Sequence, residues 1–176
     1  MAGYPSPTVI QPVIPLIDVS PLERLLLCHM MQFEDEGEEL YLFAELSIDL
    51  MPAVSLAQLR AAYMQSGDFE SRIMPYVRDI LDISHDDDDA ADIELNLTAR
   101  HNGAPFESIL QDIIRRSSTL TYLSLTTAYV CSKMRPDGFG GRATLVTEAF
   151  VRSQSTDDLM ESFIYEAKLS LPDIQF

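Results

Sequence analysis

Two pairs of strand-like segments, each joined by a short turn-rich loop, constrain the fold of this 176-residue chain more than any other feature. In the first pair, residues 31–46, aromatic and aliphatic positions flank an acidic tip that contains Gly37. In the second pair, residues 120–132 and 143–151 are rich in Thr, Tyr, Val and Leu, and a Pro- and Gly-rich tract separates them. Two strands connected in this way are typical of an antiparallel hairpin.

Helix-like segments surround these pairs and do not alternate strictly with single strands. The helices are expected to start near Ser20, Ser55, Phe69, Pro105 and Ser155 or Thr156, and one more strand is expected over residues 93–97. This order predicts an α+β fold with a mainly antiparallel sheet of about five strands, two hairpins among them. Four to five helices are expected to pack on it as a single layer on one face.

Local signals support several of these helices. Ser20, Pro21 and Glu23 have the spacing of a capping box with proline at the first helical position. Pro75 is expected either to kink its helix or to sit in its first turn. In the last helix the apolar face is expected to consist of Leu159, Phe163, Ile164 and Ala167.

Residues 1–17 combine four prolines with six aliphatic residues. Proline fixes φ and removes a hydrogen-bond donor, so we expect an extended, apolar, Pro-rich arm. The arm is expected to lie across its own domain or, as an alternative, to reach a neighbouring subunit. No linker interrupts the rest of the sequence, and residues 1–176 are therefore predicted to form a single domain.

The charge of the chain is strongly negative and uneven, with a formal net charge of -16. Residues 1–99 hold 19 acidic and 4 basic side chains, whereas residues 100–176 hold 9 and 8. Direct binding of nucleic acid or of an anionic membrane is disfavoured, because both need clustered Lys and Arg. A basic protein partner is favoured by the field, although an acidic surface can also serve solubility alone. The candidate interaction surface comprises Glu34, Asp35, Glu36, Glu38, Glu39, Asp86, Asp87, Asp88 and Asp89.

The densest basic segment is the loop over residues 132–142, which holds Lys133, Arg135, Asp137 and Arg142. Its glycines let backbone N–H groups approach a ligand, and arginine suits carboxylate or phosphate, so the loop is a candidate anion-binding site. It can alternatively meet the acidic half of a second copy in a homodimer, or serve only as a solvated hairpin loop.

Sequence signatures of catalysis, cofactor binding and metal binding are missing. The sequence has no His-Glu-x-x-His, no paired Cys-x-x-Cys, no Walker loop and no Gly-x-Ser-x-Gly. No catalytic residue, cofactor or metal is therefore predicted. Cys28 and Cys131 are too few for a disulfide scaffold and indicate thiols in a reducing cytoplasm, although pairing stays open. No apolar run is long enough for a transmembrane helix.

These observations predict a non-enzymatic, cytoplasmic interaction module that binds a protein partner. The partner is expected to be basic, or a nucleic-acid-binding protein for which the carboxylates imitate a phosphate backbone. The alternative prediction is a small-molecule or anion-binding domain, or an enzyme, centred on residues 132–142.

Overall fold

The computed structural model confirms the α+β class, with five helices and a mostly antiparallel sheet. It describes residues 4–84, 91–98, 105–133, 135 and 138–168, and only the backbone of residues 35 and 36. The strands are β1 (Thr8–Gln11), β2 (Ile14–Pro15), β3 (Gln32–Glu36), β4 (Glu39–Ala44), β5 (Ala53–Ser55), β6 (Asp92–Glu94), β7 (Tyr122–Tyr129), β8 (Gly140–Thr147) and β9 (Val151–Ser155). The helices are α1 (Pro21–Met30), α2 (Leu56–Gln65), α3 (Ile73–Ile83), α4 (Phe106–Arg116) and α5 (Thr156–Glu166), with a 3₁₀ turn at Leu16–Asp18.

Seven strands form the main sheet, in the order β2-β4-β1-β7-β8-β9, and β3 pairs with the outer side of β4. Every pairing is antiparallel. The two hairpins expected from the sequence are present as β3–β4 and β7–β8. Gly37 closes the first with a φ of +72°, a backbone conformation that favours glycine.

The Pro-rich segment contributes two strands that were not expected. Strand β1 lies between β4 and β7, where Ile10 pairs with Leu125 and Thr8 pairs with both Ala44 and Thr127. The four residues of β1 fall between Pro7 and Pro12, so no proline interrupts its hydrogen bonds. Residues 8–11 and 14–15 are therefore extended, and they are built into the sheet.

The third additional strand of the main sheet arises because residues 143–151 do not form one continuous strand. Thr147 ends β8 in a tight turn: its N–H donates to the Phe150 carbonyl at 2.9 Å, and its hydroxyl accepts from the Phe150 N–H at 3.1 Å. The chain then returns as β9, the outermost strand on this side of the sheet. The strand expected over residues 93–97 is shorter, and it pairs with β5 in a separate two-stranded sheet.

Capping residues place the helices where the sequence indicates. Ser20 and Glu23 form a complete capping box on α1, with Pro21 as the first helical residue. Ser55 caps α2 by accepting a hydrogen bond from the N–H of Gln58. Pro75 lies in the first turn of α3 and does not kink it.

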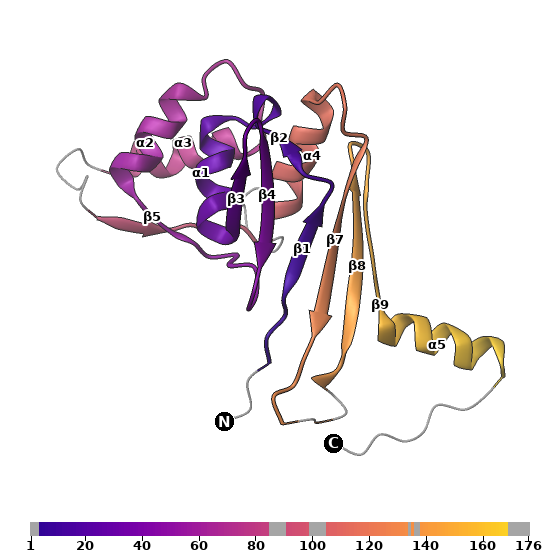
Figure 1. Ribbon diagram of the computed structural model, residues 1–176. Coiled ribbons are helices and arrows are strands. Elements are labelled where there is room, and N and C mark those ends of the chain that lie inside the picture. Colours follow the sequence, from indigo (N-terminus) through magenta and orange to yellow (C-terminus); the bar gives the residue numbers. More distant parts are fainter. Residues whose placement is uncertain (1–3, 85–90, 99–104, 134, 136–137, 169–176) are drawn as a thin grey trace.

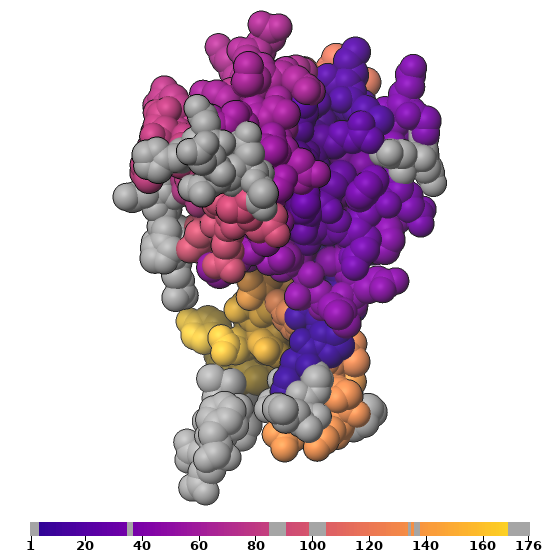
Figure 2. All heavy atoms as spheres, turned by 90° about the vertical axis from the view of Figure 1, so that its left-hand side faces the viewer, coloured from indigo at the N-terminus to yellow at the C-terminus, as the bar shows by residue number. Residues whose placement is uncertain are grey.

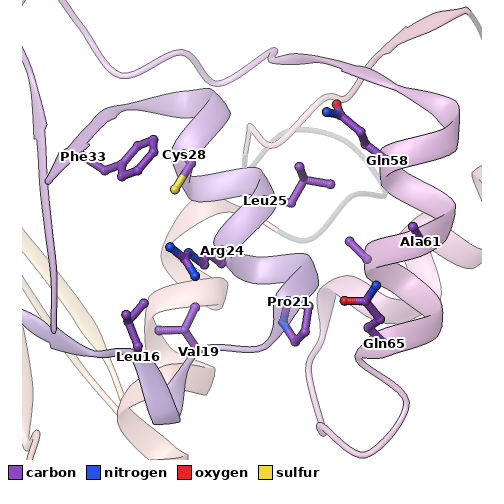
Figure 3. A pocket seen from close by; sticks show the side chains of 11 residues that line it. Leu16, Val19, Pro21, Arg24, Leu25, Cys28, Phe33, Gln58, Ala61 and Gln65 are labelled. Atoms are coloured by element: carbon purple, nitrogen blue, oxygen red, sulfur yellow. The ribbon is translucent and has the colours of Figure 1, made fainter. Parts of the chain in front are cut away.

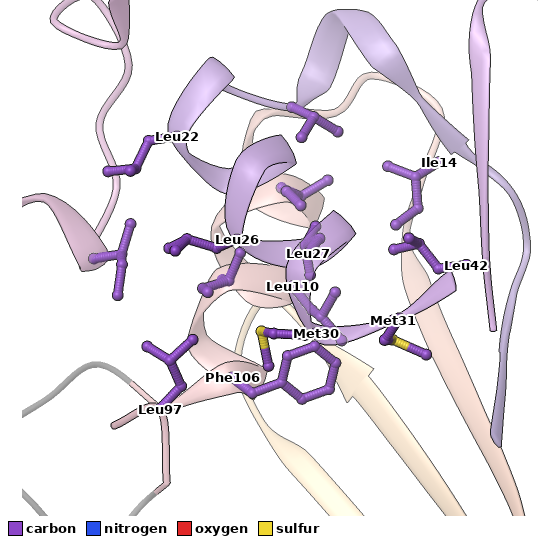
Figure 4. Packing of buried hydrophobic residues seen from close by; sticks show 14 of the residues in the cluster. Ile14, Leu22, Leu26, Leu27, Met30, Met31, Leu42, Leu97, Phe106 and Leu110 are labelled. Atoms are coloured by element: carbon purple, nitrogen blue, oxygen red, sulfur yellow. The ribbon is translucent and has the colours of Figure 1, made fainter. Parts of the chain in front are cut away.

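The hydrophobic core lies between the sheet and helices α1 and α4 (Figure 4). Leu22, Leu26 and Leu27 of α1 are fully buried, and they belong to the same cluster as Leu110 of α4 and Leu42 of β4. Burial alternates along β1 and β4, because successive side chains point to opposite faces and the helices cover only one of them. Helix α2 packs against α1 and α3.

The last third of the described chain extends beyond this core. In Figure 1 the lower parts of β7 and β8, together with α5, reach below the body that carries α1 to α4. Figure 2 shows from the side that this projecting part is narrower than the body. Among described residues after Leu125, Cys131 and Val146 are the only buried apolar side chains. This projecting part therefore has little core of its own.

Candidate docking site

The acidic residues expected to form an interaction surface are only partly described. Glu34, Glu38 and Glu39 are exposed around the β3–β4 turn. Asp35 and Glu36 belong to β3, whereas Asp86, Asp87, Asp88 and Asp89 lie outside the described residues. A continuous acidic face over both clusters therefore stays a prediction.

The basic loop lies at the opposite end of the sheet from the acidic turn (Figure 1). Lys133, Arg135 and Arg142 are exposed, and Asp137 lies outside the described residues. Arg142 is close enough to Asp158 of α5 to help lower the pKa of that carboxyl. The positive charge of Arg142, one of the loop's basic residues, therefore interacts with α5 of the same chain.

The loop is organised around the buried thiol of Cys131. The backbone N–H of Arg135 is the main cause that lowers the thiol pKa; the Lys133 N–H and the Tyr4 hydroxyl act in the same direction, and burial opposes them. Gly138 packs against this residue so closely that a Cβ there would lie 2.2 Å from the Cys131 Cβ. Since Cys131 is 1% exposed, these contacts shape the loop and do not present a nucleophile to solvent.

A buried ionic network joins α1, the start of α3, and α4. The Glu23 carboxylate is fully buried and accepts hydrogen bonds from the Ser20 N–H at 2.9 Å, from the Ser71 hydroxyl at 2.7 Å and from Arg116. The buried Asp112 carboxylate accepts from the Arg72 N–H at 2.7 Å and from the side chains of Arg72 and Arg115. Both buried carboxylates of this network are paired with an arginine, which a buried ion pair needs if it is to stabilise the fold.

Helix α5 is well formed at its start and uncovered along its length. Ser155 and Asp158 form a complete capping box, and the Thr156 hydroxyl accepts a hydrogen bond from the Gly141 N–H at 3.2 Å. None of its residues is buried. Leu159, Met160 and Phe163 are 42%, 56% and 51% exposed. The apolar face expected from the sequence is therefore present, but little of this protein covers it.

Strand β9 adds to this uncovered region. It is an edge strand, and the adjoining Leu145, Phe150 and Val151 are exposed apolar side chains. We call β9 and α5, residues 151–166, the docking arm. An exposed edge strand and an apolar helix side by side are features by which proteins bind other proteins.

A second apolar surface lies on the helical body (Figure 3). A groove of about 590 Å³ runs over the outer side of α1, from Phe33 of β3 across to α2. We call it the helical groove; its lining residues are Leu16, Val19, Pro21, Arg24, Leu25, Cys28, Phe33, Gln58, Ala61, Ala62 and Gln65. The lining is mainly apolar, with two glutamines and one charged side chain, Arg24.

The described part of the chain shows neither a metal cluster nor a membrane-spanning helix. No three His, Cys, Asp or Glu side chains there gather into a group that could hold a metal ion. No helix there combines the length and the apolarity that crossing a membrane requires. Neither Cys28 nor Cys131 forms a disulfide.

Comparisons with protein-family models, with curated proteins and with solved structures found no match to this chain. The candidate site therefore rests on the geometry of its own residues.

Sequence reasoning identified the pattern of α5 but did not assign it a binding role. Helical spacing reveals an apolar face, whereas its exposure depends on which elements the fold places nearby. The helical groove was not predicted, because its lining comes from three separated segments. Its one sequence signal was Pro21, Arg24, Leu25 and Cys28, which share one side of a helix at spacings of three, four and seven residues.

Proposed function

We propose that this protein is a non-enzymatic interaction module that binds a protein partner through the apolar face of α5. The observation that carries the proposal is an amphipathic helix with a complete N-terminal capping box and no buried residue. Isolated helices shorter than about 12 residues are marginal in water, and helices in proteins are stabilised mainly by packing an apolar face. An eleven-residue helix that exposes Leu159, Met160 and Phe163 is therefore suited to being covered by another protein surface.

The sequence placed the partner on the acidic amino-terminal half instead. Exposed carboxylates such as Glu34, Glu38 and Glu39 steer a basic partner at long range, and salt screens that attraction. Affinity depends more on apolar burial, at roughly 25 cal/mol per Å² removed from water. We therefore assign the contact to α5 and leave a steering role to the acidic turn.

The alternative function, anion binding at residues 132–142, has weaker support. Arg142 lies near Asp158, and the Arg135 and Lys133 N–H groups are directed at Cys131. These groups are already engaged within the protein, so fewer remain to hold an anion.

A cytoplasmic location is part of the proposal of an interaction module. It is supported by both cysteines remaining thiols.

Site-specific photocrosslinking in the native host tests the proposed function. A benzophenone side chain placed at Phe163 samples the apolar face, and the matched control places it at Tyr165, which is 85% exposed on the opposite side of α5. We expect a protein adduct from position 163 and much less from position 165. Equal labelling at both positions, or no adduct at 163, would contradict the proposal.

A further inference from the structure

We infer that the partner of the docking arm is a second copy of this chain, whose helical groove receives the apolar face of α5. This inference rests on the proposed function and names its partner. The two surfaces it joins lie near opposite edges of the main sheet, and each presents exposed apolar side chains.

The two surfaces match in form. The apolar side chains of α5 recur at Leu159, Met160, Phe163 and Ile164, the spacing with which an amphipathic helix fills a groove. Helices α1 and α2 run side by side in opposite directions along the groove (Figure 3), and each has ten residues against the eleven of α5. At 1.5 Å per residue all three helices are about 15 Å long, so the apolar side chains of α5 can lie along α1 and α2 over the length of these helices.

The one charged residue in the groove lining is opposite in sign to the charged residues of α5. Helix α5 contains Asp157, Asp158, Glu161 and Glu166 and no basic residue. Most surfaces of a chain with a net charge of -16 repel such a helix. The charged residue of the groove lining is Arg24, which is exposed. Arg24 already has an interaction within its own chain, and its exposed guanidinium can in addition be approached by a carboxylate bordering the apolar face of α5 while Phe163 and Leu159 enter the groove.

The arm does not reach the groove of its own molecule. The groove adjoins β3 at one edge of the main sheet, and α5 follows β9 at the other edge (Figure 1). Contact therefore joins two copies. Two such contacts close a reciprocal dimer, and a head-to-tail arrangement closes a ring when its rotation permits.

Mass measurement by light scattering on purified full-length chains tests the inference. Phe163→Asp places a charge on the apolar face of α5, and Ala61→Glu places one in the groove. The matched controls are Tyr165→Asp on the other side of α5 and Ala57→Glu, an exposed position one turn earlier on α2 and outside the groove lining. Circular dichroism confirms that each variant is folded.

We expect wild type and both controls to form dimers or larger species at tens of micromolar. Phe163→Asp and Ala61→Glu each weaken association by about thirtyfold or more, the loss typical of a central interface residue. The decisive sample mixes these two variants in equal amounts. One retains an intact groove and the other an intact arm, so the mixture forms heterodimers that neither variant forms alone.

Several results would overturn the inference. A monomeric wild type excludes a second copy, and association that survives Ala61→Glu or fails to recover in the mixture excludes the groove. Photocrosslinking at position 163 separates this inference from the proposed function. An adduct with a different protein alone refutes the second copy and supports the docking function, whereas no adduct refutes both.

Discussion

The carboxylate of Glu23 is buried between α1 and α4, where Arg116, Ser71 and the Ser20 N–H surround it. Glu23→Ala leaves the Arg116 guanidinium, 19% exposed, without this partner and removes half of the α1 capping box. We expect the free energy of unfolding in urea to fall by about 3–5 kcal/mol. The control is the exposed Glu39→Ala, with an expected change within about 0.5 kcal/mol. A similarly small decrease in the free energy of unfolding in both variants would show that the buried ionic network contributes little to stability.

Gly138 controls how tightly the 132–142 loop encloses the Cys131 thiol. A Cβ at Gly138 would lie 2.2 Å from the Cys131 Cβ, so Gly138→Ala forces the two segments apart. We expect iodoacetamide to alkylate Cys131 faster in this variant because the thiol becomes accessible. Gly67→Ala is the control, since a Cβ there meets its nearest atom at 3.7 Å. Unchanged alkylation in Gly138→Ala would mean that the loop does not shield the thiol.

At the scale of single elements, the cap of α5 is sensitive to pH. Hydrogen bonds from Ser155 lower the pKa of Asp158 below the ordinary 3.8, and Arg142 contributes in the same direction. The cap therefore stabilises α5 fully above about pH 4, and this stabilisation is lost as the pH falls through the lowered pKa.

Carboxyl NMR titration of Asp158 measures this effect. We expect a midpoint below 3.8 in wild type and a higher midpoint in Ser155→Ala, which removes the side-chain hydrogen bond of Ser155 to Asp158 and leaves the Ser155 backbone N–H as a donor to the carboxylate. A wild-type midpoint at or above 3.8 would contradict the capping geometry.

Elements with local signals could be predicted from the sequence, and those fixed by distant pairing could not. Ser20 with Glu23, Ser55 and Ser155 mark helix starts because their partners lie within three residues. Strand β1 pairs with residues more than a hundred positions away, at Ser124 to Thr127, and no local pattern specifies that partner. The β8–β9 turn was missed because Glu148, Ala149 and Phe150 include none of the Gly, Pro, Asn or Asp residues that usually mark a turn.

At the scale of the whole molecule, the candidate site likewise combines features that the sequence predicts with features that depend on the fold. The sequence predicted where the negative charge lies along the chain and which residues of α5 are apolar. It could not show that α5 stands away from the core, because that depends on the position of β9 at the sheet edge. The helical groove likewise exists only once Phe33, α1 and α2 are folded together.

The most direct test of this account uses tryptophan as a reporter, because the chain contains none. Phe163→Trp and Tyr165→Trp each place one indole on α5, on the apolar and the polar side respectively. Emission and acrylamide quenching are recorded while the full-length protein is diluted from tens of micromolar to nanomolar concentrations. We expect a blue-shifted, protected tryptophan at position 163 that becomes exposed on dilution, and an exposed one at position 165 throughout. A tryptophan at position 163 that is as exposed as the one at position 165 at every concentration would contradict it.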